Sequence, residues 1–229
     1  MFYILFDTSN NSVTSDTHLI NVFDTELPQI IDVSDLNLKQ FNTSSTIDLS
    51  LSGTDNIDLL NSKVIIITPN DKEVIIDLIK QANTFTNQYT IPEQLGIFQI
   101  KFELTDTSLN TKTSLIQTFS TLDTTLPEFE IIENLDNKTY PTLQNVDFAI
   151  IATDNIGINK VTANIELSNQ TNIKIPLTLS QENTYTSTYK IPELIGNYNI
   201  QYIITDSTNN DITSNIQTIN VVDTTNPTI

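Results

Sequence analysis

The chain has 229 residues, of which 38% are hydrophobic and 17% charged, a composition typical of a folded protein rather than a disordered one. Its formal net charge of −18 repels phosphate backbones and anionic lipids, so we expect no nucleic-acid partner. Cysteine is absent, which excludes a disulfide scaffold, a thiolate metal site and a cysteine nucleophile. No apolar run approaches the roughly 20 residues of a transmembrane helix, so we expect no direct membrane insertion in this segment.

A repeated linker divides the sequence at regular steps. The pentapeptides DTELP, DTTLP and DTTNP begin at Asp24, Asp123 and Asp223, and TDNI at 54–57 returns at 153–156. We therefore expect four segments: a C-terminal remnant of a preceding repeat in 1–23, full repeats in 24–122 and 123–222, and a linker with the start of a next first strand in 223–229. A quarter of a repeat has no core of its own, so we expect the sequence to be a piece of a longer repeat protein.

Alternation of apolar and polar residues predicts the elements inside each repeat. In chain order the first repeat is expected to contain about seven strands, at 29–33, 46–53, 63–68, 73–80, 84–91, 97–105 and 112–122. In the sixth of these, Phe98, Ile100, Phe102 and Leu104 point one way, and the second repeat offers Tyr198, Ile200, Tyr202 and Ile204. One buried and one solvated face is typical of antiparallel sheets. The predicted fold class is therefore all-β, with one antiparallel β-sandwich per repeat.

The stretch IPELIGNYNIQYIITD, residues 191–206, resembles the corner before the sixth strand of immunoglobulin-like and fibronectin-type-III-like domains. Tyr198 stands where those domains place a tyrosine that bonds to the upstream backbone, and Phe98 stands there in the first repeat. With the D-T-T-x-P linker, the sequence resembles the tandem Ig-like repeats of bacterial and archaeal surface proteins such as S-layer subunits and adhesin stalks. The resemblance implies tandem immunoglobulin-like sandwiches of about seven strands each, located outside the cell at its surface.

Recurring aspartates form the main candidate site. In a seven-stranded sandwich of this kind, the incoming linker meets two loops at one end. These places carry Asp24, Asp55 and Asp106 in the first repeat, and Asp123, Asp154 and Asp206 in the second. Converging carboxylates repel one another unless a cation lies between them, and their oxygens suit Ca²⁺. We predict calcium as the cofactor, with Glu93 reaching Asp123 from the preceding repeat; the alternative is that these aspartates only form Asx-turns.

The sequence contains no nucleophile motif, P-loop or zinc-binding motif, and the lone histidine, His18, has glutamines at the equivalent places in both full repeats. We therefore expect a non-catalytic structural segment of an extracellular assembly, an S-layer, filament or stalk. Its expected partners are further copies of the same or a neighbouring repeat protein in a homo-oligomeric assembly. The alternative is a carbohydrate- or protein-binding adhesin or accessory module. That alternative needs an exposed aromatic platform, for which only Tyr140, expected in a loop, is available.

Overall fold

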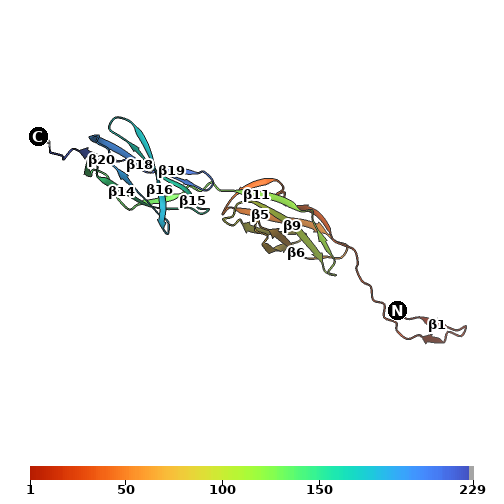
Figure 1. The fold of residues 1–229 in the computed structure, drawn as a ribbon. Helices are drawn as coiled ribbons and strands as arrows, with labels where there is room; N and C mark the ends of the chain where they lie inside the picture. The colour runs from red at the N-terminus through yellow and green to blue at the C-terminus, as the bar shows by residue number, and fades with distance from the viewer. Residues whose placement is uncertain (227–229) are drawn as a thin grey trace. The chain divides into compact units, whose positions relative to one another are not determined.

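The computed structural model describes residues 1–226. Regular structure in this part of the chain is β-strand, arranged as a two-stranded hairpin and two nine-stranded sheets (Figure 1). The chain divides into two compact units, each containing most of one nine-stranded sheet. No helix in the described part is long and apolar enough to cross a lipid bilayer. The expectation that Pro227 and Ile229 open a further strand lies outside the described residues.

The first sandwich contains nine strands: β3 (Gln29–Val33), β4 (Lys39–Asn42), β5 (Thr46–Thr54), β6 (Leu59–Ile67), β7 (Glu73–Gln81), β8 (Thr84–Thr90), β9 (Ile97–Asp106), β10 (Thr111–Thr113) and β11 (Gln117–Leu122). The strand order is β3-β5-β8-β7-β6-β9-β11-β4, and β10 pairs with β9. Because β7 pairs with β6 through 73–78 and with β8 through 79–81, it passes from one layer to the other. The layers β3-β5-β8-β7 and β6-β9-β11 are those of an immunoglobulin-like sandwich.

The second sandwich repeats this order strand for strand. Its elements are β12 (Glu128–Ile131), β13 (Thr139–Pro141), β14 (Asn145–Thr153), β15 (Ile158–Glu166), β16 (Asn172–Gln181), β17 (Thr184–Lys190), β18 (Gly196–Asp206), β19 (Asp211–Thr213) and β20 (Gln217–Val222). They are ordered β12-β14-β17-β16-β15-β18-β20-β13, with β19 on β18. The all-β, tandem Ig-like fold class predicted from the sequence is confirmed.

The alternating side chains form the core of each sandwich. Phe98, Ile100, Phe102 and Leu104 of β9 are buried, as are Tyr198, Ile200, Tyr202 and Ile204 of β18. The facing strands contribute the other side of each core, with Leu49 and Leu51 in β5 and Phe148 and Ile150 in β14. Each fully buried side chain of this size stabilises the fold by about 1.5–3 kcal/mol relative to leaving it in water.

The corner before the sixth long strand differs between the repeats in the way the sequence predicts. The Tyr198 hydroxyl donates a hydrogen bond of 2.6 Å to the carbonyl oxygen of Leu194, which fixes the loop against the core. Phe98 has no hydroxyl and instead stacks on Phe119, with ring centroids 4.9 Å apart and planes 6° apart. The first repeat therefore replaces a directional bond by aromatic packing at the same position.

The predicted strand 112–122 is wrong as one element, because it is interrupted at 114–116. Ser114 replaces a backbone partner there: its hydroxyl accepts a 3.0 Å bond from the Phe102 N–H and donates one of 2.8 Å to the Leu115 carbonyl. In the second repeat Ser214 makes the same bonds, with Tyr202 and Asn215. Tyr140, expected in a loop, lies in β13 and packs against the core, so it is not an exposed aromatic platform.

Residues 1–23 contain an isolated hairpin of β1 (Ile4–Phe6) and β2 (Ser12–Thr14). The Asp7 carboxylate closes its turn by accepting hydrogen bonds from the Ser9 and Asn11 backbone N–H groups at 2.8 and 2.9 Å. Tyr3 and Leu5 are exposed in this hairpin, although the equivalent residues Phe102 and Leu104 are core residues of the first sandwich. The hairpin thus exposes side chains whose equivalents in the first sandwich are buried.

Candidate cation-binding sites

Each predicted aspartate triad is assembled at one end of its own sandwich. In the first, Asp24 precedes β3, Asp55 follows β5, and Asp106 ends β9. One carboxylate oxygen from each of the three lies within 4.8 Å of the others. Asp123, Asp154 and Asp206 meet under the same limit in the second sandwich. The order of the strands explains this convergence, because the end of β5 in one layer and the end of β9 in the other lie at the same end of the sandwich as the incoming linker.

Asp106 and Asp206 are the most buried members of the two triads. Neither side chain is exposed to solvent. The Asp206 Oδ1 atom accepts hydrogen bonds of 2.7 and 2.8 Å from the backbone N–H groups of Thr208 and Asn210. Its Oδ2 atom accepts one of 2.7 Å from the Asn210 side-chain amide. Asp106 has the matching bonds with Ser108 and Asn110, each of 2.8 Å.

These bonds keep Asp206 ionised in spite of its burial. Removal from water raises the pKa of a carboxyl group, and this is the largest single influence on Asp206. The backbone and side-chain bonds from Asn210 and Thr208 act together in the opposite direction, so the pKa of Asp206 is held below its usual range. The second triad therefore contains a buried negative charge at neutral pH.

Two oxygens of the first triad have no donor. The Asp24 Oδ1 atom accepts bonds of 3.0 Å from the Glu26 N–H and 3.2 Å from the Asn56 amide, whereas its Oδ2 atom is buried without a hydrogen-bond partner within residues 1–226. Asp55 uses Oδ2 to accept a bond of 3.0 Å from the Ile57 N–H, and its buried Oδ1 is unpaired in the same part of the chain.

The second triad leaves a similar pair of oxygens without donors. The Asp154 Oδ1 atom accepts bonds of 2.9 Å from both the Ile156 and Gly157 N–H groups, while its buried Oδ2 has no partner in the described chain. The neighbouring Asn155 donates its amide to Asp123 at 3.3 Å, and its amide oxygen is also buried and unpaired there.

Buried oxygens that can only accept are costly when nothing donates to them, at about 1–3 kcal/mol each and more when charged. The four lysine–carboxylate ion pairs within residues 1–226 involve other acids: Asp35, Glu103, Asp58 and Glu133. A cation among the three carboxylates would satisfy the unpaired oxygens and offset the repulsion. With oxygen donors only, the set fits a hard cation such as Ca²⁺ better than a transition metal.

The structure also shows which expected residues stand apart. Glu93 belongs to neither triad, and its carboxylate accepts a 3.3 Å bond from the Ser44 hydroxyl. Asn110 and Asn210 use their amide nitrogens as donors to Asp106 and Asp206, and the buried amide oxygen of Asn155 has no hydrogen-bond partner within residues 1–226.

Thr208 is a member of the second site that sequence reasoning missed. Its hydroxyl bridges two of the acids, with bonds of 3.3 Å to Asp123 Oδ2 and 2.9 Å to Asp206 Oδ1. The signal for it was present in the sequence, because a hydroxyl residue two places after an aspartate is the usual member of an Asx-turn. Ser108 occupies this position in the first repeat. A serine has the hydroxyl of a threonine but lacks its methyl group.

The fold and the sites define a tandem immunoglobulin-like repeat protein with an acidic triad at the linker end of each repeat. Compared with protein families and with curated proteins, the chain matches none.

Solved structures with a similar fold come from varied proteins. One is the fibronectin(III)-like modules of CbhA from Clostridium thermocellum, at 16% identity and a TM-score of 0.34, covering 86% of this chain and 94% of that one. Another is a tetra-tandem repeat in the extending region of a large adhesion protein, at 14% identity and a TM-score of 0.45, covering 95% of this chain and 54% of that one. A third is the titin domains Z1Z2 in complex with telethonin, at 14% identity and a TM-score of 0.36, covering 88% and 98%.

Proposed function

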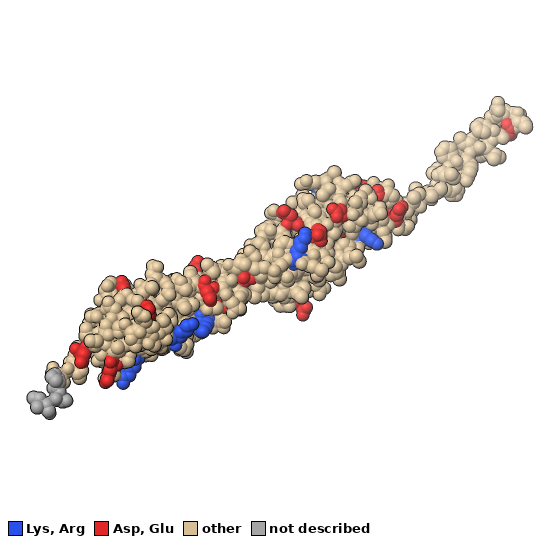
Figure 2. Space-filling model, turned by 90° about the horizontal axis from the view of Figure 1, so that it is seen from above, with Lys and Arg blue, Asp and Glu red and all other residues tan. Residues whose placement is uncertain are grey.

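We propose that this chain is a structural repeat segment of an extracellular cell-surface assembly, an S-layer, filament or stalk, in which each repeat holds one calcium ion at its aspartate triad. The tandem arrangement of two sandwiches with the same strand order supports a spacer role, since such repeats are built to extend a chain. The acidic surface supports a location where cations are plentiful. On the face in Figure 2, acidic side chains are scattered over both units rather than gathered into one patch.

The observation that carries the calcium proposal is the set of buried, unpaired oxygens of Asp24, Asp55, Asp154 and Asn155. Asx-turns explain the paired oxygen of each carboxylate, because the backbone N–H groups two or three residues onward occupy it. Turns do not explain why the second oxygens of Asp24, Asp55 and Asp154 are buried without a donor within residues 1–226, beside two other carboxylate groups. A bound cation explains both at once.

The proposed ion has a mechanical role. Asp123 directly follows β11 and precedes β12, so it is part of the connection between successive repeats. A cation shared by Asp123, Asp154 and Asp206 would fix this connection to two loops of the second sandwich. Loss of the ion would free the connection to fluctuate, since three like charges would then repel. Calcium would thus stiffen the chain of repeats.

Thermal unfolding of residues 24–222 tests the calcium proposal. We expect the midpoint of the wild type to rise in Ca²⁺ relative to a chelator, by the amount that ligand binding to the folded state supplies. The Asp123→Ala, Asp154→Ala double variant should show no such rise in the second repeat. An unchanged midpoint for the wild type would refute the calcium proposal but would not test the structural role.

Surface location and assembly need their own tests. Antibodies raised against residues 24–222 should label intact cells that carry the protein, and labelling confined to permeabilised cells would contradict a cell-surface role. We also propose that neighbouring copies associate through cations, given the charge of −18 on each chain. Sedimentation of the chain at increasing Ca²⁺ should then show larger species, and a monomer at every concentration would contradict this part.

A further inference from the structure

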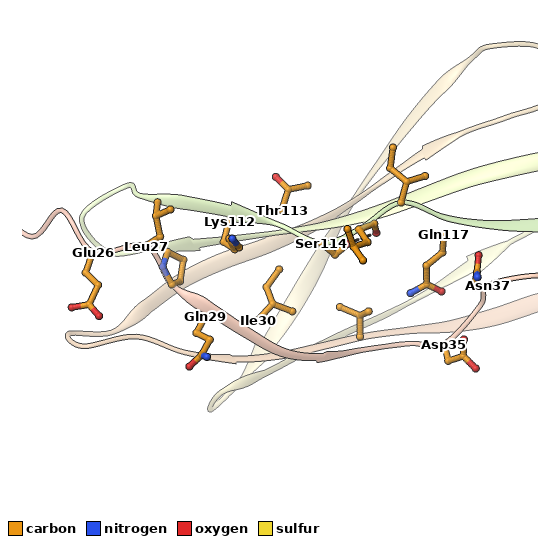
Figure 3. A pocket seen from close by; sticks show the side chains of 14 residues that line it. Glu26, Leu27, Gln29, Ile30, Asp35, Asn37, Lys112, Thr113, Ser114 and Gln117 are labelled. Atoms are coloured by element: carbon orange, nitrogen blue, oxygen red, sulfur yellow. Dashed lines mark hydrogen bonds between the residues drawn. The ribbon is translucent and has the colours of Figure 1, made fainter.

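The first sandwich contains an open groove of about 1050 Å³ between β3 and the chain from Lys112 to Gln117 (Figure 3). Both walls are strand edges: among the described residues 1–226, β3 pairs with β5 alone and β10 with β9 alone. Residues 114–116, the next part of the second wall, belong to no strand, although the Ser114 N–H still donates a 2.8 Å bond to the Phe102 carbonyl oxygen. Unpaired strand edges present rows of backbone donors and acceptors, which makes them sites for adding a strand from another molecule.

Hydrogen bonds at the two ends hold the walls in place. At one end the Gln117 side chain accepts a 2.7 Å bond from the Leu36 N–H and donates one of 3.0 Å to the Ser34 carbonyl. At the other end the Asn110 amide donates to the Asp24 carbonyl at 3.3 Å. Between these links β3 and β10 are not paired with each other. The groove is therefore a built feature of the sandwich rather than an opened seam.

The lining has the pattern of a strand-binding groove. Leu27, Ile30, Val33, Leu115 and Ile116 supply apolar surface, and Figure 3 shows Ile30 lying between the two walls. Leu115 is 89% exposed, which is unfavourable for an apolar side chain that nothing covers. A strand in the groove would cover it. Five residues of β3 correspond to about 17 Å of extended chain, enough to pair with a segment of five or six residues.

The charged residues of the groove indicate which kind of segment would bind there. Glu26 and Asp35 lie at opposite ends of the groove in Figure 3, and Asp32 is exposed on β3 itself. Asp35 forms an exposed ion pair with Lys39 at 3.4 Å, and Lys112 is the one basic residue among those that line the groove. Opposite charges on paired strands attract, and another copy of this chain brings a further net charge of −18. The groove therefore favours a basic segment over a second copy.

We propose that the groove between β3 and residues 112–117 binds an extended segment of a different protein, with β-branched residues in its middle and basic residues at its ends. The segment adds as a strand along β3 and covers Leu115 and Ile116. Pro28, which has no N–H, precedes the five residues of β3, and the register of β3 is irregular between Ile30 and Asp32, so we expect pairing with a short segment only.

The second repeat is a natural control for this proposal. Asn215 stands where the first repeat has Leu115, and the equivalent opening, lined by Ile131, Asn134, Asp136 and residues 215–217, measures about 330 Å³. The Leu115→Asn variant therefore places in the groove a residue that the same fold already accepts. Leu179→Asn, at a 61% exposed leucine on β16, is the matched control outside the groove.

Amide NMR with a synthetic peptide tests the proposal on the full chain. The probe is acetyl-Lys-Thr-Val-Thr-Val-Lys-amide, and the comparison peptide has glutamates in place of the lysines. We expect shifts of the amides of 29–33 and 112–116, about tenfold weaker binding of the glutamate peptide, and about fivefold weaker binding by Leu115→Asn. Leu179→Asn should bind as the wild type does.

Three outcomes would overturn the proposal. The first is an absence of shifts at about 5 mM peptide, a concentration that reveals even weak binding. The second is a set of shifts outside the groove, or equal binding by Leu115→Asn. The third is a concentration-dependent dimer without peptide that Leu115→Asn abolishes, which would make a second copy the occupant.

Discussion

The substitution Asp154→Asn distinguishes a metal site from a set of Asx-turns, because the two explanations predict opposite changes in the stability of the second repeat. An asparagine keeps the Oδ1 atom that accepts bonds from the Ile156 and Gly157 N–H groups. It replaces the buried, unpaired Oδ2 by an amide and removes one of the three charges. Without a cation this change should stabilise the second repeat, whereas with Ca²⁺ it should remove a ligand.

The magnitude follows from the geometry of the triad. Two unit charges 4.8 Å apart repel by about 1 kcal/mol in bulk water and about 3.5 kcal/mol at an effective dielectric constant of 20. Asp154 is partly exposed, so the lower figure applies, and loss of its two repulsions stabilises by about 2 kcal/mol. For a domain of this size that corresponds to a rise of about 10 °C in the unfolding midpoint. Ca²⁺ at about 100 times its dissociation constant would stabilise the wild type by about 2.7 kcal/mol.

Differential scanning calorimetry measures the unfolding midpoint of each protein in chelator and in Ca²⁺. We expect Asp154→Asn to unfold above the wild type in chelator and to lose this advantage in Ca²⁺. Glu182→Gln, at an exposed turn residue, removes one charge outside the triad and should shift both conditions equally. A lower midpoint for Asp154→Asn in chelator would refute the repulsion argument. Equal responses of both proteins to Ca²⁺ would refute the ligand assignment.

Three further changes test other parts of the structure. Tyr198→Phe removes the 2.6 Å bond to Leu194 and should lower the free energy of unfolding by about 1 kcal/mol in urea titrations; no change would mean that the corner is held by packing alone. Gly53→Ala places a Cβ atom 2.7 Å from the Gln29 carbonyl oxygen and should destabilise by about 1–3 kcal/mol in the same assay, unless β3 moves. Because the pKa of Asp206 is lowered by folding, its contribution to stability is complete above about pH 4 and is lost as the pH falls through the folded pKa. Urea titrations of the wild type and Asp206→Asn in chelator should show a steeper acid loss for the wild type, and parallel curves would contradict this assignment.

The strands with a buried face could be predicted because their signal is local. The period of two in 29–33 and 97–105 comes from side chains that face one core, and both strands are observed within one residue of the predicted ends. The short strands β4 and β13 could not be predicted in this way. They have three or four residues, and each is defined by pairing with a strand about 80 residues later in the chain, β11 or β20.

The candidate site also has a part that could be predicted from the sequence and a part that could not. The meeting of Asp24, Asp55 and Asp106 follows from the order of strands and loops, which the repeat reveals. The direction of each amide does not. Asn110 donates to Asp106 of its own loop, whereas Asn155 donates to Asp123 of the linker and leaves its buried oxygen without a partner within residues 1–226. Such choices depend on distances between loops that no single stretch of sequence records.

The pairing of β13 with β20 has a consequence for a chain pulled from its two ends. These strands are parallel, with Thr139, Tyr140 and Pro141 opposite Asn220, Val221 and Val222. Tension enters the sandwich before β12, which pairs with β14, and leaves it after β20. The force that reaches β13 pulls β13 and β20 in opposite directions along their length. Their hydrogen bonds are then loaded in shear and must yield together, whereas bonds peeled apart at a hairpin yield one after another. The linkers therefore load the repeat in the direction in which these hydrogen bonds resist force best.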